Sequence, residues 1–513
     1  MPIPMLRLAV LLLAGSIATG QALAQRIWVD AVHGSDSNDG LTLATAFKTL
    51  TKAMEGSDQP PNRHVNVRPG IYDGSNGESF PIEIGTYRRV FGSNGAIIDG
   101  GGASVAVRAA GSGFSPPQKL YDFEIRHAGL GLELTKASIL TQGLHVHDCD
   151  IGVRGSYQTT LSGPTSLGIS SSLIEDCRVG VETFGSTRFA SGLLKIRNIQ
   201  EDGLRMHWSG TTAGAGLAMS RVCIEDCGDA AVRVQLEAPD PLDLSVEACL
   251  LTDCGIGLVL DDPAGQGQFG GYVRRLTLAS HRIGLTAAYS ASSTLRLRGI
   301  LLADNVLDVD AGTTALDIED SLLEGGQYAG APGVIQGDPS FVHAAGKDYA
   351  LRAGSPAIDG IRSQPYYLSI PSFNQVDTSD GDLDARVGDD IGALEFATLR
   401  GSDVTASGAP YEVQVFGKPG TTAQLFTART FPAVIGTYLR TPSGLQGLDP
   451  DTLRLLGTVT VPSGGAPGVL QIPISSDPAL IGTSLFLQAA LPSSASPTGM
   501  AWSNRLRALI QAP

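Results

Sequence analysis

Residues 172–184 read SLIEDCRVGVETF, and a similar arrangement returns at residues 250–261 as LLTDCGIGLVLD. Each stretch places a short alternating strand before an Asp-Cys pair and starts a second strand with an apolar-x-apolar triplet. A strand–turn–strand unit of this length cannot bury its own apolar face, so neighbouring units must stack on one another. The pattern therefore predicts a parallel β-helix.

The triplet recurs seven times along the middle of the chain. Its occurrences are Ile151-Gly152-Val153, Val179-Gly180-Val181, Leu204-Arg205-Met206, Val232-Arg233-Val234, Ile256-Gly257-Leu258, Ile283-Gly284-Leu285 and Leu307-Asp308-Val309. Successive triplets are 28, 25, 28, 24, 27 and 24 residues apart, a mean of 26. We expect about nine coils between Ile97 and Leu323, which at about 4.8 Å per strand make a column about 40 Å tall.

A small polar or turn-tolerant residue stands two positions before six of the triplets. These residues are Cys149, Cys177, Asp202, Cys254, His281 and Asn305. The coil at Val232 departs from the pattern, because Cys227 lies five residues before it. The recurrence predicts one turn position that is repeated in every coil.

The composition agrees with a large β-rich protein. Of 513 residues, 64 are Gly and 29 are Pro, while charged residues make up only 17% and hydrophobic ones 42%. This balance excludes a disordered chain and supplies enough apolar residues for a core. The formal net charge of −15 disfavours nucleic acid and anionic membranes as partners.

The first 24 residues have the arrangement of a secretory signal peptide. Arg7 precedes an apolar run, and Ala22-Leu23-Ala24 stands directly before Gln25. We expect cleavage near Ala24 and a mature protein that is secreted, either extracellular or periplasmic. The apolar run is too short to span a bilayer and no later stretch is long enough, so we expect no membrane span, and we expect a monomer.

Six cysteines follow in this chain: Cys149, Cys177, Cys223, Cys227, Cys249 and Cys254. In an exported protein they are able to form up to three disulfides, and buried free thiols are the alternative. The repeat places Cys149 near Cys177, and Cys223 near Cys249, in adjacent coils.

The column needs a cap at each end, because a β-helix exposes strand edges there. We assign residues 25–96 to an N-terminal cap with the first strands and a short amphipathic helix near residues 46–54. The coils occupy 97–337, and a closing segment occupies 338–397. After a linker at 398–404, residues 405–513 lack the 26-residue period and alternate in short stretches, which predicts an antiparallel β-sandwich.

Two sequence runs resemble a known group of proteins. WVDAVHGSDSNDGLTLATAFKTLTKAM at 28–54, with VRPGIYDGSNGESFPIEI at 67–84, resembles the N-terminal region of unknown function of secreted bacterial pectin-lyase-like proteins. DYALRAGSPAIDG at 348–360 and DLDARVGDDIGALEF at 382–396 resemble their closing segment. The resemblance implies an all-β, single-stranded, right-handed parallel β-helix, in a group that includes polysaccharide lyases, glycosidases, epimerases and non-catalytic surface proteins.

A basic group is expected in the middle of the column. If the apolar residues of each triplet point inward, the middle residue and the residue after the triplet point outward. Read in this way, the outward face carries what we call the Arg/His stripe, made of Arg154, Arg205, His207 and Arg233. Glu182, Gln235 and Trp208 are expected beside it as further contacts to a substrate.

The Arg/His stripe suits an acidic sugar polymer, because a guanidinium binds a carboxylate bidentately. Arg205 or Arg233 would neutralise a uronate carboxylate, and His207 would remove the proton at C5 in a β-elimination. The alternative is that any soluble column carries polar residues outside. Neither a paired-Asp glycosidase arrangement nor the calcium-and-base set of a known lyase is found in the sequence.

Two acidic loops are candidate calcium sites, because calcium prefers several oxygen ligands. One contains Asp36, Asn38 and Asp39, and the other contains Asp380, Asp382 and Asp384. Turn formation explains the same residue types, so a protein without a cofactor is the alternative.

His145 and His147 stand two apart on one strand, a spacing that is also found among metal ligands. No third ligand is evident in the sequence, and an outward polar pair is the alternative interpretation.

Three functions remain open at this point. The first is a secreted β-helix protein that binds polysaccharide or a cell-surface glycan without an identified catalytic motif. The second is a polysaccharide lyase that acts on a uronic-acid-containing glycan through the Arg/His stripe. The third is an adhesin-like structural stalk.

Overall fold

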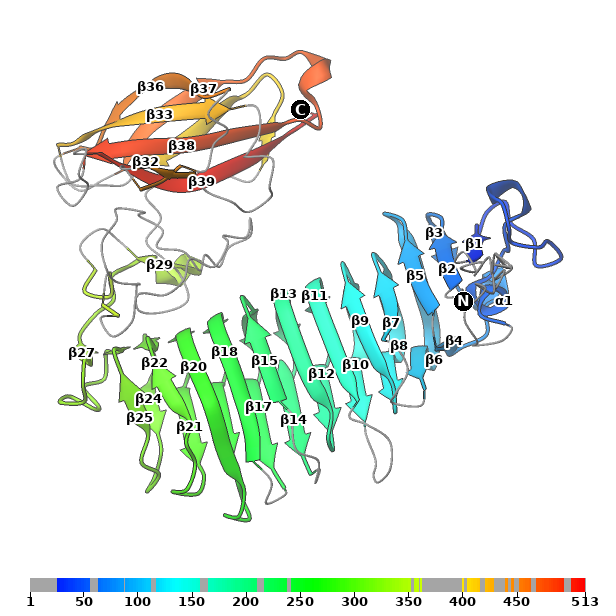
Figure 1. The fold of residues 1–513 in the computed structure, drawn as a ribbon, viewed down its shortest axis with the longest axis horizontal. Coiled ribbons are helices and arrows are strands. Elements are labelled where there is room, and N and C mark those ends of the chain that lie inside the picture. The colour runs from blue at the N-terminus through cyan, green and yellow to red at the C-terminus, as the bar shows by residue number, and fades with distance from the viewer. Residues whose placement is uncertain are drawn as a thin grey trace, which may run out of the picture.

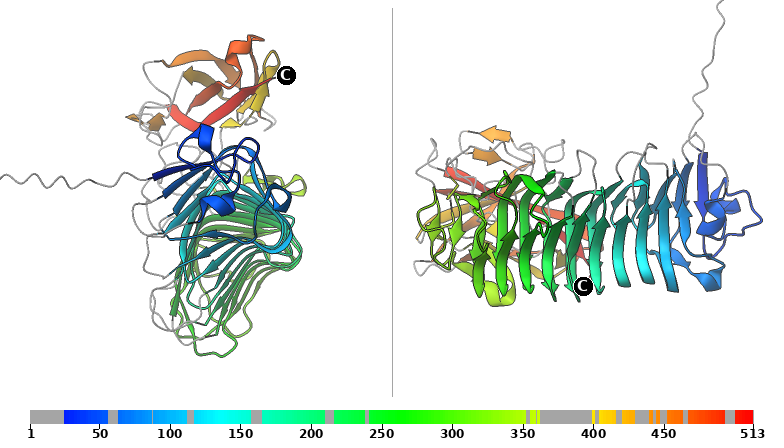
Figure 2. Two further views of the ribbon diagram at one scale, coloured as in Figure 1. Left: turned by 90° about the vertical axis from the view of Figure 1, so that its right-hand side faces the viewer. Right: turned by 90° about the horizontal axis from the view of Figure 1, so that it is seen from below.

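The computed structural model is dominated by one long parallel β-helix (Figure 1). It describes residues 25–55, 63–86, 88–111, 117–156, 165–209, 216–237, 241–351, 355–358, 360–361, 399–400, 404–415, 420–428, 439–441, 444–446, 452–462, 467–492 and 500–512. Strands β1 to β27 belong to one parallel sheet system of about nine turns, as the repeat predicts. Their rungs stack side by side along the column (Figure 2).

The column strands have the following bounds. They are β1 (Gln25–Val29), β2 (Arg63–Val67), β3 (Gly70–Tyr72), β4 (Ile82–Ile84), β5 (Arg88–Gly92), β6 (Ala96–Ala110), β7 (Gln118–Tyr121), β8 (Glu124–Thr135), β9 (Ser138–Gln142), β10 (His145–Ser156), β11 (Ser166–Glu175), β12 (Val179–Phe184), β13 (Arg188–Ile199), β14 (Leu204–Trp208), β15 (Gly216–Ser220), β16 (Cys223–Cys227), β17 (Ala230–Leu236), β18 (Pro241–Thr252), β19 (Ile256–Asp261), β20 (Gln268–Ala279), β21 (Ile283–Ala288), β22 (Arg296–Arg298), β23 (Leu301–Ala303), β24 (Leu307–Asp310), β25 (Asp317–Glu319), β26 (Leu322–Leu323) and β27 (Ile335–Gln336).

Each full turn of the chain crosses three faces. In one turn β9 lies on the first face, and β10 continues over the second and third faces. In the next turn β11 covers the first and second faces and β12 covers the third. The pairing confirms this division, because β9 pairs with β11, the start of β10 with the end of β11, and the end of β10 with β12.

The corner between the second and third faces explains the recurring Asp-Cys pairs. Asp148, Asp176, Asp226 and Asp253 all have positive φ angles between 51° and 56°. Asp tolerates this left-handed conformation better than most residues, so it allows a strand to bend without ending. The following cysteine turns into the core.

The cysteine position continues into an internal ladder. The N–H of Cys254 donates to His281 Nδ1 at 3.1 Å, and the N–H of His281 donates to Asn305 Oδ1 at 3.0 Å. The N–H of Cys227 likewise faces Cys254 Sγ at 3.3 Å. All six cysteines are free thiols, so the structure has the free thiols that were the alternative to disulfides.

The expected outward direction of the triplet glycines is wrong. A Cβ on Gly152 would lie 2.7 Å from the side chain of Ile174 and 3.6 Å from Cys177 Sγ, both core groups. A Cβ on Gly180 would lie 2.4 Å from the carbonyl oxygen of Gly203. Glycine therefore recurs here because neighbouring rungs approach too closely for a side chain.

The register corrects the alignment of two triplets. Leu204 pairs with Val181 and with Val232, whereas Val181 pairs with Val153. Leu204 and Val232, the first residues of their triplets, therefore occupy the register position that the third residue occupies in the other triplets. Asp202 consequently does not occupy the same turn position as Cys177. The irregular spacing before Val232 results from the same shift, which the coils of Leu204 and Val232 share.

The N-terminal cap contains the predicted helix, shortened to α1 (Leu50–Ala53). Thr49 caps its first turn by accepting the N–H of Lys52. Glu78 is buried beneath it and accepts the N–H groups of Leu50 and Thr51 at 2.5 and 2.8 Å. Short 3-10 turns are η1 (Leu43–Thr45), η2 (Gly74–Asn76), η3 (Ala344–Gly346) and η4 (Pro478–Leu480).

The far end of the column is followed by an antiparallel pair, β28 (Phe341–His343) with β29 (Asp348–Leu351). Tyr349 anchors this pair to the coils, because its hydroxyl lies 2.9 Å from Asp253 Oδ2. Lys347 Nζ also lies 2.5 Å from Asp226 Oδ2.

The C-terminal region forms separate sheets that are largely antiparallel. Their strands are β30 (Leu399–Arg400), β31 (Val404–Ala406), β32 (Pro410–Val415), β33 (Thr422–Ala428), β34 (Leu439–Thr441), β35 (Gly444–Gln446), β36 (Arg454–Thr460), β37 (Gly468–Pro473), β38 (Ser484–Pro492) and β39 (Met500–Gln511). Val413 and Ile472 from one sheet and Leu425 and Leu487 from another share a core, as in a sandwich. Within the described parts of the chain, no helix is long and apolar enough to cross a membrane.

Candidate functional site

The outward row on the third face alternates in charge from Glu83 to Arg205 and ends with a second arginine, Arg233. Its members, here called the charge ladder, are register partners in successive rungs: Glu83, Arg108, Glu133, Arg154, Glu182, Arg205 and Arg233. Arg108 contacts Glu133 at 2.7 Å and Glu83 at 3.0 Å, and Arg154 contacts Glu182 at 2.7 Å. Opposite charges directly across a sheet stabilise its register. The three arginines of the Arg/His stripe thus belong to the later part of a longer structural ladder, which begins at Glu83.

Asp202 is the centre of this network. Its carboxylate is fully buried, and it receives Arg205 Nε at 2.6 Å and Arg233 Nε at 3.0 Å. It also accepts the N–H of Ala230 at 2.9 Å. Burial acts to raise the pKa of this carboxyl, but the hydrogen bonds from Arg233, Arg205 and Ala230 outweigh burial, so the pKa lies below its ordinary value.

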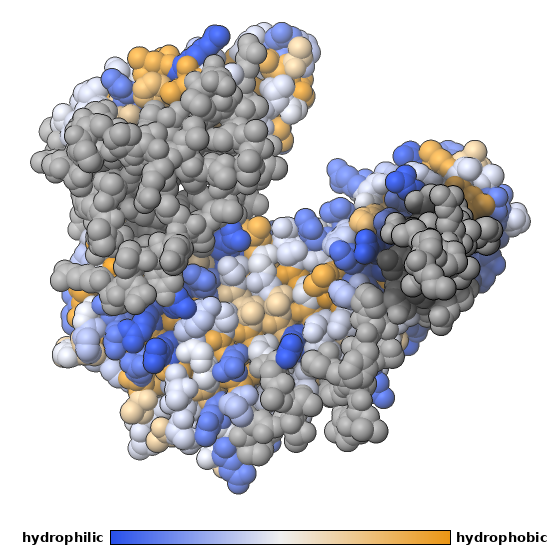
Figure 3. All heavy atoms as spheres, in the orientation of Figure 1, coloured by the Kyte–Doolittle hydropathy of each residue, from blue (hydrophilic) through white to orange (hydrophobic). Residues whose placement is uncertain are grey.

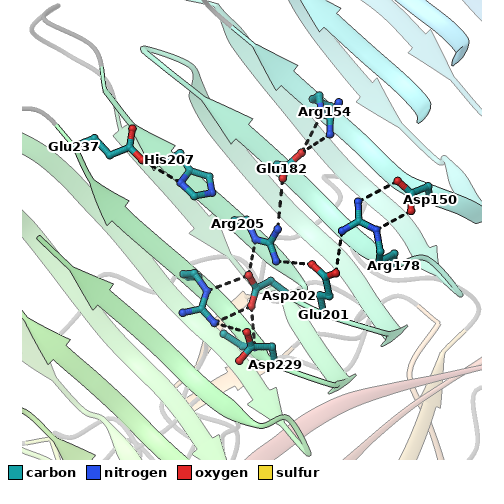
Figure 4. A network of polar contacts seen from close by, with 12 residues as sticks. Asp150, Arg154, Arg178, Glu182, Glu201, Asp202, Arg205, His207, Asp229 and Glu237 are labelled. Carbon is teal, nitrogen blue, oxygen red and sulfur yellow. Dashed lines mark hydrogen bonds and ion pairs between the residues drawn. The ribbon is translucent and has the colours of Figure 1, made fainter. Parts of the chain in front are cut away.

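Other guanidinium nitrogens of Arg205 and Arg233 also have carboxylate partners (Figure 4). Arg205 Nη2 lies 2.8 Å from Glu201, and Arg233 Nη2 lies 2.7 Å from Asp229. Arg178, which the sequence analysis did not select, bridges the network to Asp150, because its Nε and Nη1 lie 2.7 and 3.0 Å from Asp150 and Glu201. Hydrogen bonds to these two acids raise the pKa of Arg178 above its ordinary value.

His207 lies one row further along the strand. Its ring stacks on Phe184 with centroids 5.1 Å apart and an interplanar angle of 6°. Its Nδ1 is 3.5 Å from Glu237, and Gln235 is its register partner in the next rung. Trp208, expected to contact substrate, has no exposed surface, so its ring is not available to stack on a sugar.

The network as a whole is not basic. Its four arginines and His207 face six carboxylates: Asp150, Glu182, Glu201, Asp202, Asp229 and Glu237. A uronate carboxylate approaching Arg205 or Arg233 would have to displace acids that already bind them at 2.6 to 3.0 Å. The geometry therefore gives little support to an anion-binding role for these arginines.

The N-terminal acidic loop uses its polar groups for turn formation. Asp36 accepts the N–H groups of Lys48 and Thr49 at 2.8 and 2.9 Å. Asn38 donates to the carbonyl of Ala46, and Asp39 accepts from Thr45 Oγ1 at 2.6 Å. These bonds account for the three residues without an ion. The second calcium candidate, Asp380, Asp382 and Asp384, lies outside the described residues.

A groove on the first face was not anticipated from the sequence. It has a volume of about 370 Å³ and crosses six successive rungs, from β7 to β18. Its lining residues are Tyr121, Leu140, Thr141, Gln142, Gly168, Ile169, Ser170, Ala190, Ser191, Gly192, Ala218, Met219, Ser220, Ser245 and Glu247. The five spacings of about 4.8 Å between these six rungs give a length of roughly 24 Å. The volume falls within the range of small-molecule and cofactor sites.

The groove exists because two outward rows carry small side chains in the middle rungs. One row runs through Gly168, Ala190 and Ala218, and the parallel row includes Gly192 and Ser220. In the rungs at either end of the groove, the same two rows carry larger side chains. In Figure 3, apolar surface runs along the column, across successive rungs rather than along one strand.

Aromatic residues mark both ends of the groove. At one end Tyr121 packs against Phe91, with ring centroids 5.3 Å apart. At the other end Tyr272 is the register partner of Ser245 in the next rung. The Ser245 hydroxyl donates a hydrogen bond to the Tyr272 hydroxyl oxygen at 2.8 Å. The guanidinium of Arg274 lies 3.7 Å over the Tyr272 ring. Glu247 is the one charged residue that lines the groove among the described residues.

The signals that mark the two sites differ in strength. The charge ladder can be recognised in the sequence, because Glu and Arg recur at the spacing of the coils when the row is followed back to Glu83. The groove is formed by Gly, Ala and Ser, which carry no chemical signature, so only the register of the rungs brings them together.

Comparison with known proteins adds a family match to this geometry. Residues 32–148 match the family model described as "Protein of unknown function (DUF1565)", a domain typical of β-helix proteins. No curated protein matches. Among solved structures, a GH136 lacto-N-biosidase from Eubacterium ramulus aligns at 10% identity over 57% of this chain and 68% of that chain, with a TM-score of 0.21. The match at 32–148 and the column of about nine turns are consistent with a pectin-lyase-like β-helix protein.

Proposed function

We propose that this protein binds a neutral glycan chain in the groove on its first face. The observation that carries the proposal is the row of small side chains that hollows six rungs of the column between aromatic ends. A linear chain would lie along the column axis and contact one rung after another.

The chemistry of the groove suits sugars. The hydroxyl of Ser220 and the amide of Gln142 lie beside apolar surface from Leu140, which is 42% exposed. The hydroxyls of Ser170 and Ser245 already donate within the protein, so they are available to a ligand as acceptors. Pockets of this kind combine apolar contact with a few polar groups that fix orientation. The amphipathic ring of Tyr121 would support the apolar face of a sugar ring at one end, whereas Arg274 already lies over the ring of Tyr272 beyond the other end.

The charges favour a neutral polymer over an acidic one. Glu247 would repel a uronate in the groove, and the arginines of the charge ladder are held by their own carboxylates. The lyase alternative therefore has less support than glycan binding, since it needs a guanidinium to neutralise the substrate carboxylate.

We also propose that binding takes place outside the cytoplasm, on polysaccharide or a cell-surface glycan. The leader ending at Ala24 supports export. N-terminal sequencing of protein recovered from a bacterial periplasm or medium tests this, with Gln25 as the expected first residue.

Electrophoresis in gels that contain single polysaccharides tests the proposed ligand class. We expect neutral polymers to retard the mature protein and uronic-acid polymers to leave it unretarded. Tyr121→Ala should weaken retardation, whereas Arg154→Ala, which changes the third face, should not.

Two outcomes would overturn the proposal. Retardation by uronic-acid polymers that is lost in Arg205→Ala would place the ligand on the charge ladder, and unsaturated ultraviolet-absorbing products would indicate a lyase. No retardation by any neutral polymer of the panel would favour the adhesin-like stalk.

A further inference from the structure

Three potential metal ligands meet on the second face of the column. Glu124 lies at the start of β8, and His145 is its register partner at the start of β10. His147 follows two residues later on the same side of the strand, and its ring centroid lies 4.5 Å from that of His145. One donor atom from each of the three residues lies within 4.8 Å of the other two. Glu124 is the third ligand that the sequence did not reveal.

Each imidazole is already oriented by a second carboxylate. His145 Nε2 lies 2.7 Å from Glu175 Oε1, and His147 Nδ1 lies 2.7 Å from Asp148 Oδ2. One nitrogen of each ring is thus held by an acid outside the triad, which leaves the other for a metal. Metal-binding histidines commonly donate their second nitrogen to a carboxylate in this way.

The spacing between donors fits a tetrahedral ion. His147 Nε2 lies 3.3 Å from Glu124 Oε1. Two ligand atoms about 2.1 Å from a tetrahedral zinc are about 3.4 Å apart. These two atoms therefore already hold the separation that a bound ion would impose.

The surrounding charges favour a cation. Asp99, Asp148 and Glu175 lie around the triad, in addition to Glu124 itself. Two arginines oppose them: Arg126 contacts Glu124 and Asp99 at 2.9 Å, and Arg197 contacts Glu175 at 2.6 Å. A bound ion and Arg126 would both contact Glu124. Arg126 would also remain paired with Asp99.

We propose that Glu124, His145 and His147 bind a divalent transition-metal ion, with zinc as the best match to two imidazoles and one carboxylate. Calcium and magnesium prefer oxygen ligands alone and fit this donor set poorly. The side chains of His145 and Glu124 are 39% and 27% exposed, so the ion would keep at least one position open to water. The site would also join two rungs of the column.

Calorimetric titration of metal-free, untagged protein with zinc tests the proposal. We expect one zinc ion per chain. His145→Gln and His147→Gln should each weaken binding at least tenfold, and Asp148→Asn should weaken it by about 10- to 100-fold through the orientation of His147. Cobalt(II) in place of zinc should give a visible absorption band that is lost in the same variants.

His127→Gln is the matched control, because His127 lies beside the triad without belonging to it. Its Nδ1 bonds Asp99 at 3.0 Å, and its Nε2 reaches Asp148 Oδ2 only at 3.9 Å. Zinc should also raise the unfolding temperature of the parent and the control but not of His147→Gln. Glu124→Gln provides an independent variant if a histidine variant does not fold. Zinc binding that is absent, or that survives in both His147→Gln and Glu124→Gln, would overturn the proposal, as would an equal loss in His127→Gln.

Discussion

Arg205 Nε lies 2.6 Å from Oδ2 of Asp202, a carboxylate without exposed surface. Arg233 Nε reaches the same oxygen from the next rung, at 3.0 Å. The arginines that stand out in the sequence as a basic stripe are therefore bound by an acid of their own column. Their first role is to hold rungs together, and the proposed ligand lies in the groove on the first face.

Replacement of Asp202 tests this structural role. Asp202→Ala should lower the free energy of unfolding by about 3 kcal/mol, because it leaves two partly buried guanidinium groups without their shared partner. Asp229→Ala is the control, since Asp229 binds Arg233 from an exposed position and should cost less than about 1 kcal/mol. Urea denaturation of both variants measures the difference, and equal losses would contradict the central place of Asp202.

The stability of the column should depend on pH through His281. Burial lowers the pKa of His281 below its ordinary value of 6.5, against the opposite effect of hydrogen bonds to the carbonyls of Leu251 and Cys254. Below pH 6.5 the unfolded chain binds a proton at this residue that the folded chain resists, so the free energy of unfolding falls as the pH is lowered.

Denaturation at several pH values between 5 and 7.5 measures this effect. His281→Asn keeps an acceptor for the N–H of Cys254 and should flatten the dependence. His33→Asn, a change at an exposed histidine, should leave the slope intact. A slope that is the same in all three proteins would exclude His281 as its source.

Close packing between rungs predicts different outcomes for two glycines. A Cβ on Gly180 would lie 2.4 Å from the carbonyl oxygen of Gly203 and 2.9 Å from Ile196, so Gly180→Ala should destabilise by about 1 to 3 kcal/mol. A Cβ on Gly192 would meet nothing nearer than 3.7 Å, so Gly192→Ala should change stability by less than about 0.5 kcal/mol. Thermal unfolding compares them, and the reverse order would contradict the register.

The thiols should be free but slow to react in the folded protein. Burial raises the pKa of Cys149 to about 11 and that of Cys177 and Cys249 to about 12. A colorimetric thiol reagent should therefore react slowly with native protein and count six thiols after unfolding without reductant. A count below six after unfolding would show that disulfides form after all.

The sequence predicted the column well because its repeat follows directly from packing. The triplets mark where each rung enters the third face, and the Asp-Cys pairs mark the corner before it. The alignment of the triplets was wrong only at Leu204 and Val232. In these two coils one additional residue lies between the corner and the strand on the third face. A period in the sequence measures coil length, but it does not by itself fix which residues pair.

The functional surface was harder to predict for physical reasons. Arg205 and Arg233 were selected by residue type, and their partner Asp202 became visible only when the register was known. The groove through Gly168, Ala190 and Ala218 has no reactive group to recognise. His145 and His147 were noticed as a pair, whereas Glu124 lies on the preceding strand and joins them only through pairing.

The most direct test of the account is calorimetric titration of a neutral oligosaccharide, taken from the polymer that retards the parent protein, into two matched tryptophan variants. Ala190→Trp fills the groove on the first face, and Ala288→Trp adds the same ring at an exposed alanine on the third face. We predict that Ala190→Trp lowers the affinity at least tenfold while Ala288→Trp binds like the parent. Unchanged binding in Ala190→Trp, or an equal loss in Ala288→Trp, would contradict the assignment of the glycan to this groove.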